Sequence, residues 1–163
     1  MGNCESTERL ILEYVAACQA RDYERIWTFY DDAIVCEDRA LGIVNNGIEE
    51  TKHFYYTTMS SLDVNWVVTH VYATDEGFGL EGYMEGVHVK DLPGMPATGR
   101  SFHVPCASVG EVCGGKITAN RDYWNNVDLL KQLGLRRSVT SPSEAPAAAS
   151  GEPTNSGARH VVN

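Results

Sequence analysis

The spacing of hydrophobic side chains along this chain changes from helical to alternating at about residue 64. Before that point, apolar residues recur at intervals of three and four, which predicts three helices. Ser6 or Thr7 is the expected N-cap of the first helix. The apolar positions are Leu10, Ile11, Tyr14, Val15 and Cys18 in the first helix, Tyr23, Ile26, Trp27 and Tyr30 in the second, and Ile48, Phe54, Tyr55, Met59 and Leu62 in the third, which spans 45–62.

From residue 64 onward the period is two, which predicts long β-strands separated by turn residues. A shorter strand over 31–38 lies between the second and third helices. Helices followed by an antiparallel meander are typical of the α+β class. We therefore expect a cone-shaped barrel, in which three helices pack on a curved, mixed but mostly antiparallel sheet that encloses a deep pocket. The expected long strands are 64–73, 77–89, 100–112 and 116–124.

The two ends of the chain differ from this folded part. Residues 138–163 are rich in Ser, Ala, Pro and Gly, and such a segment cannot bury enough apolar surface to offset the entropy of ordering it. We expect one domain over 1–137 and a disordered tail over 138–163. The first six residues, MGNCES, match an N-myristoylation pattern, which we interpret as a chance match because no polybasic patch supports an anchor.

Charge and cysteine content exclude several classes of protein. A formal net charge of −9 argues against a protein that follows nucleic-acid phosphates, and no apolar run is long enough to span a membrane. The five cysteines are scattered, and none forms a CxxC pair, so we interpret them as reduced thiols of a cytoplasmic protein. The His and Cys residues do not recur at metal-ligand spacing, and no dinucleotide or phosphate motif is present. Neither a metal nor a cofactor is therefore expected.

One acidic residue, Asp122, lies within the last predicted strand. The Gly114-Gly115 turn predicts a tight hairpin. If Val112 faces Lys116, the same face of the sheet carries three cross-strand pairs. A carboxylate on this largely apolar face should have a raised pKa, which suits a general acid or base near neutral pH. The three predicted pairs are Cys106 with Asp122, Val104 with Trp124, and Ser108 with Asn120.

The stretch TGRSFHVPCASVGEVCGGKITANRDYWNN resembles the limonene epoxide hydrolase-like proteins, and the run through VDLLKQLGL resembles the SnoaL-like polyketide cyclases. Both families have the nuclear transport factor two-like cone fold, and the resemblance covers about Arg9 to Leu135. It implies that Asp122 corresponds to the aspartate that acts as the base and activates water in the hydrolases. Asn125 stands at the place of their second aspartate, Gly86 and His88 at the places of an Arg-x-Asp pair, and Val35 and Glu37 near a water-holding Tyr and Asn. The resemblance also implies a homodimer that packs sheet against sheet.

Two further residues are candidates for proton transfer beside Asp122. Gly86-Val87-His88 fits the G-x-H stretch of the cyclases, and alternation places His88 on the face of Met84. Because a strand separates them, His88 and Asp122 should lie about 10 Å apart and act through the substrate. Glu37 is the third catalytic candidate, with Asp38 pointing the other way. The expected substrate-binding wall consists of Trp124, Asn120, Cys106, Val104 and Tyr14.

These residues favour a cofactor-free acid–base enzyme that cyclises, isomerises or dehydrates an apolar small molecule resembling a polyketide or terpenoid. The alternatives are an epoxide hydrolase, in which Asp122 activates water, and a non-catalytic ligand-binding module. The absence of the Arg-x-Asp pair disfavours the epoxide hydrolase, and the presence of a carboxylate in the pocket disfavours the non-catalytic module.

Overall fold

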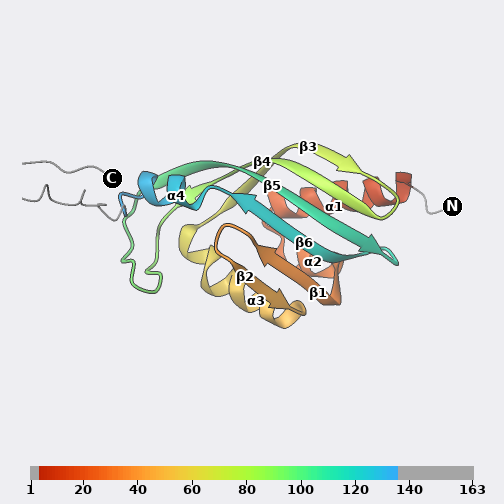
Figure 1. Ribbon diagram of the computed structural model, residues 1–163, viewed down its shortest axis with the longest axis horizontal. Helices are drawn as coiled ribbons and strands as arrows, with labels where there is room; N and C mark the ends of the chain where they lie inside the picture. Colours follow the sequence, from red (N-terminus) through yellow and green to blue (C-terminus); the bar gives the residue numbers. More distant parts are fainter. Residues whose placement is uncertain (1–3, 136–163) are drawn as a thin grey trace, which may run out of the picture.

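The computed structural model describes residues 4–135. The expected disordered tail and the MGN start lie outside these residues. Within them, α1, α2 and α3 lie along one face of a sheet, and α4 lies at one end of it (Figure 1). The helical elements are α1 (Cys4–Gln19), α2 (Tyr23–Phe29), α3 (Ile48–Thr57), the 3₁₀ helix η1 (Met59–Leu62) and α4 (Asn126–Gln132).

The sheet has six strands in the order β2-β1-β6-β5-β4-β3 among the described residues, and it does not close into a complete barrel. Strands β1 and β6 run parallel, and all other neighbours are antiparallel. The predicted α+β cone with a mixed, mostly antiparallel sheet is confirmed. The strands are β1 (Tyr30–Asp38), β2 (Ile43–Asn46), β3 (Asn65–Ala73), β4 (Gly77–Val87), β5 (Ser101–Cys113) and β6 (Lys116–Trp124).

The prediction of one helix over 45–62 was wrong. The segment begins within β2, passes through α3 and ends in η1. Gly47 separates the strand from α3 with a φ of 87°, a conformation that glycine adopts without strain. The polar pair Asn45-Asn46 concealed a short edge strand, because its pairing with β1 is a long-range contact that local periodicity does not reveal.

The core consists of two clusters. The first joins α1 and α2 to the middle of the sheet and includes Ile11, Ile34 and Ile117, all with 0% exposure. The second joins η1 and α4 to the other end of β4 and β5, and it includes Met84 and Val104. The cavity described below has walls from both clusters. The position of the second cluster therefore decides how far the cavity extends along the strands.

Strands β3 and β4 approach each other unusually closely at Gly82. A Cβ atom on Gly82 would lie 2.0 Å from the carbonyl oxygen of Val67, so no larger residue fits without a backbone shift. The β3–β4 register shifts between Val68 and His70, immediately beside this contact. Such a bulge increases local twist, and it curves the sheet around the cavity.

Candidate active site

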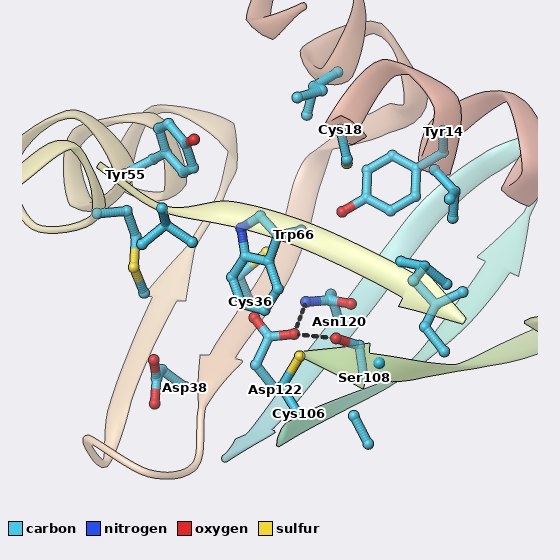
Figure 2. A pocket seen from close by; sticks show the side chains of 18 of the residues that line it. Tyr14, Cys18, Cys36, Asp38, Tyr55, Trp66, Cys106, Ser108, Asn120 and Asp122 are labelled. Atoms are coloured by element: carbon cyan, nitrogen blue, oxygen red, sulfur yellow. Dashed lines mark hydrogen bonds between the residues drawn. The ribbon is translucent and has the colours of Figure 1, made fainter. Parts of the chain in front are cut away.

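The centre of the site is Asp122 on β6, which lines a cavity between the sheet and the helices (Figure 2). Its Oδ1 accepts a hydrogen bond from Ser108 Oγ at 2.5 Å and another from Asn120 Nδ2 at 3.0 Å. Burial raises the pKa of Asp122 from its usual value to about 6, and the two hydrogen bonds oppose part of this rise. The side chain is therefore able to accept or return a proton near neutral pH.

The face predicted for Asp122 is confirmed, but the predicted pairs across the hairpin were wrong. Asp122 pairs with Ser108, and Trp124 pairs with Cys106. Two one-residue differences produce this result: Cys113 rather than Val112 pairs with Lys116, and the register shifts again between Glu111 and Val112. The total shift is two residues, so every side chain stays on its predicted face.

The cavity encloses about 110 Å³ and is bounded by α1, α2, α3, η1 and all six strands of the sheet. Its wall contains several aromatic side chains and no Lys, Arg or His. Of the predicted substrate-binding residues, Asn120, Cys106 and Tyr14 lie in the wall. Aromatic residues from the helices, together with a tryptophan of β3, form an apolar part of the same wall; they are Tyr14, Trp27, Phe54, Tyr55 and Trp66.

Three cysteine side chains also face the cavity, one each from α1, β1 and β5. Burial raises the pKa of each of Cys18, Cys36 and Cys106 to about 12. All three are therefore neutral thiols at physiological pH, and they act as small apolar wall groups rather than as nucleophiles.

Tyr14 on α1 and Tyr30 at the start of β1 form a hydrogen-bonded pair inside the cavity wall. Their hydroxyl oxygens are 2.8 Å apart, and both side chains are buried. Burial raises both pKa values well above the usual value, so both phenols keep their protons. Only one of them can donate to the other. The proton of the accepting hydroxyl is then available for an oxygen atom of a bound molecule.

Asp38 on β1 shares the cavity face with Asp122, an arrangement that the sequence interpretation missed. The two residues are register partners on adjacent parallel strands, and both line the cavity (Figure 2). Asp38 Oδ1 accepts hydrogen bonds from the backbone N–H groups of Ala40 and Leu41, and Oδ2 accepts one from Trp124 Nε1 at 3.1 Å. Burial nevertheless raises the pKa of Asp38 above its usual value.

The prediction that Glu37 faces the pocket and Asp38 points away was wrong in its choice of face. The register partner of Glu37 is Arg121, which lies on the face opposite Asp122. Glu37 borders the cavity, but its carboxylate forms ion pairs with Arg39 at 2.6 Å and Arg121 at 3.3 Å. The alternation of Ile34, Cys36 and Asp38, all buried, was the available signal. Ala33 and Val35 provided an equally apolar alternation on the other face, which hid it.

The placement of His88 on the Asp122 cavity was also wrong. His88 follows β4, has 0% exposure and does not belong to the cavity wall. Its Nδ1 lies 3.3 Å from Thr98 Oγ1, and its Nε2 has no hydrogen-bond partner among the described residues. Alternation gave the face correctly, but the second core cluster fills that face beyond Gly82. A side chain in this position has no surface with which to touch a substrate.

Two predicted wall residues lie in the same second cluster instead of the cavity wall. Val104 has 0% exposure and pairs with Met84, so it is a core residue. Trp124 packs against this cluster, and it approaches the site only through its hydrogen bond to Asp38. For both residues alternation predicted the correct face of the sheet, but they lie beyond the end of the cavity along their strands.

Residues 8–133 match the family of SnoaL-like polyketide cyclases, and the chain belongs to this family. No curated protein matches the chain. Within residues 4–135 no group of three or more His, Cys, Asp or Glu side chains is placed to hold a metal ion, and no helix there is both long and apolar enough to cross a membrane.

Solved structures share the fold at low sequence identity. A protein from Catenulispora acidiphila with a ketosteroid isomerase-like fold, in complex with trimethylamine, is 23% identical, with a TM-score of 0.66 over 80% of this chain and 95% of the other. A proposed SnoaL-like polyketide cyclase from Jannaschia is 14% identical, with a TM-score of 0.70 over 80% and 96%. AclR from Streptomyces galilaeus, a proposed hydroxylase, is 20% identical, with a TM-score of 0.69 over 84% and 90%.

Proposed function

We propose that this protein catalyses proton transfer on an uncharged, carbonyl-containing small molecule, without a cofactor, in a reaction of the cyclisation, isomerisation or dehydration type. Asp122 is the acid–base residue. The observation that carries the proposal is a carboxylate with a pKa of about 6, held by two neutral donors in an aromatic cavity. Family membership supports a cyclase-type reaction.

The chemistry follows from the positions of the polar groups. Ionised Asp122 removes a proton from a carbon beside the substrate carbonyl, and the electron pair moves onto the carbonyl oxygen to give an enolate. The Tyr14–Tyr30 pair has one hydroxyl proton available to donate to that oxygen. In a cyclisation, the enolate carbon then attacks a second carbonyl carbon, the π electrons of that carbonyl move onto its oxygen, and protonated Asp122 returns its proton to the resulting alkoxide. In an isomerisation, protonated Asp122 returns its proton to a different carbon.

The charge of the wall restricts the substrate to molecules without an acidic group inside the cavity. The wall contains no Lys, Arg or His, and its inward-facing acidic side chains are Asp38 and Asp122. An anion would lose its hydration and find no cationic partner there. A neutral ketone or ester avoids this cost.

Epoxide hydrolysis is a second candidate, favoured by the neighbouring Asn120. Its amide nitrogen donates to Asp122 and leaves its amide oxygen to accept a hydrogen bond. A water molecule held between this amide oxygen and the carboxylate would be activated by Asp122. Incorporation of ¹⁸O from labelled water into a diol product would distinguish this reaction from enolisation.

The direct test is hydrogen–deuterium exchange at the carbon beside the carbonyl in small neutral ketones such as acetophenone and cyclohexanone, followed by proton NMR in D₂O. Wild-type protein should accelerate exchange, and Asp122→Asn should lose about 10²–10⁴-fold of this acceleration. Glu37→Gln is the matched control, because its carboxylate lies on the opposite face and is paired with Arg39 and Arg121. Full activity of a folded Asp122→Asn protein would exclude the proposed role.

A further inference from the structure

Asp38 and Asp122 are two buried acidic residues side by side on one face of the sheet. They are direct partners in the parallel β1–β6 register, and adjacent strands are about 4.8 Å apart. Both residues line the wall of one cavity, and Figure 2 shows them on neighbouring strands at its edge and its centre. Two negative charges on neighbouring buried residues repel each other more strongly than they would in water.

The neighbouring groups provide no positive charge to compensate this pair. The side chains of the cavity wall that titrate come from α1, α3, β1, β4 and β5, and they include no Lys, Arg or His. The buried tyrosines and thiols among them are neutral, because burial raises the pKa values of Tyr14, Tyr30 and Tyr55 and of the three cysteines. Glu81 lies on a strand position that is exposed to solvent, near His70. Besides the pair, the titrating residues that border the cavity are Tyr14, Cys18, Tyr30, Cys36, Glu37, Tyr55, Glu81, Tyr83 and Cys106.

The hydrogen bonds of the two carboxylates are unequal. Asp38 accepts three, from the N–H groups of Ala40 and Leu41 and from Trp124 Nε1. Asp122 accepts two from side chains, both on the same oxygen. More donors stabilise the charged form more strongly, so Asp38 is the better site for the first negative charge.

We propose that Asp38 and Asp122 form a coupled carboxylate pair, in which Asp38 ionises first and its charge holds the proton on Asp122. Asp38 is then a positioning residue, since only 4% of it is exposed and it acts through Asp122. The negative charge of Asp38 contributes, together with burial, to the raised pKa of Asp122. This inference refines the proposed function, because it explains how the base is kept near neutrality.

The test measures the titration of Asp122 directly, by NMR of ¹³C-labelled aspartate carboxyl groups, so it does not require turnover. Asp38→Asn should lower the titration midpoint of Asp122 by about one pH unit, because the neighbouring charge is gone. Glu37→Gln, one residue away on the opposite face, should change it far less. If the fold is intact and the midpoint in Asp38→Asn equals that of wild type, the coupling does not exist.

A second variant separates charge from packing. In Asp38→Asn the new amide can still accept from Ala40 and Leu41, but its N–H₂ group would face the N–H of Trp124. Asp38→Asn combined with Trp124→Phe removes this conflict and should show the same fall in midpoint. Trp124→Phe alone keeps the charge of Asp38 and should keep a high Asp122 midpoint. A fall in Trp124→Phe as large as in the double variant would assign the effect to packing and overturn the proposal. If the Asp122 midpoints follow the predictions but wild-type protein does not accelerate ketone exchange, only the proposed function is contradicted.

Discussion

The hydroxyl group of Ser108 donates to Asp122 Oδ1 over 2.5 Å, across the β5–β6 pair. This contact stabilises the ionised carboxylate, and it therefore lowers a pKa that burial raises. The two effects together leave the group at about 6, within the range where proton transfer near neutral pH is efficient.

Removal of that hydroxyl should shift the working range of Asp122 upward. Ser108→Ala deletes a hydrogen bond to a charged group, so we expect the midpoint of Asp122 to rise by about one pH unit. The pH at which the exchange rate rises should increase by the same amount. Measurement of the pH–rate profile checks this, and Ser101→Ala, an exposed position on the same strand, is the control. An unchanged or lower midpoint would show that Ser108 does not support the charge.

Asp122 should also make stability depend on pH. Its pKa is near 4 when unfolded and about 6 when folded, so between these values the folded state binds more protons than the unfolded state. The free energy of unfolding should therefore fall as pH rises from 4 to 6, by up to about 3 kcal/mol, and this loss persists at higher pH.

Asp122→Asn isolates this contribution. The amide carries no charge at any pH, so the variant should be more stable than wild type at pH 8, and the difference should shrink toward pH 4. Urea unfolding at both pH values measures it. A constant difference between the two proteins across this range would show that Asp122 has an ordinary pKa in the folded state.

Most of the fold could be predicted from the sequence, because strands β3 to β6 are long and alternate clearly. The Gly114-Gly115 turn gave the hairpin, and parity placed Asp122 on the inner face. A register error of two residues does not change the face on which a side chain lies, so this prediction held despite the error. The face of β1 could not be predicted in the same way, since its pairing with β6 is parallel and joins distant parts of the chain.

The limits of the site were less predictable than its centre. Alternation says which face a side chain is on, but it does not say where along the strand a cavity ends. His88 and Val104 share the face of the cavity, and both are buried beyond it, where η1 and α4 complete the core. Asp38, the residue after Glu37, is the neighbour of Asp122. An uncertainty about which face of β1 points inward therefore changed the candidate residue.

The homodimer expected from the family resemblance is still a prediction. The outer face of the sheet exposes Tyr72, Val109 and Tyr123, with 58%, 41% and 45% of their surfaces accessible. If two sheets pack face to face, Val109→Glu should place a charge in the contact and shift the protein toward monomer in sedimentation velocity. Leu12→Glu, on exposed α1 at 49%, should leave the sedimentation coefficient unchanged. A wild-type protein that sediments as a monomer would contradict the dimer.

Replacement of His88 tests whether this residue belongs to the chemistry or to the core. Its Nε2 is buried without a partner among the described residues, which costs about 1–3 kcal/mol. His88→Leu fills a similar volume and removes this polar atom, while it loses only the 3.3 Å contact with Thr98. We therefore expect an unchanged or higher melting temperature and exchange activity within a few-fold of wild type. Thr98→Val, which removes the same contact and keeps the imidazole, is the matched control. A folded His88→Leu protein that loses activity as completely as Asp122→Asn would restore His88 as a catalytic residue and would require the cavity to open toward it during turnover.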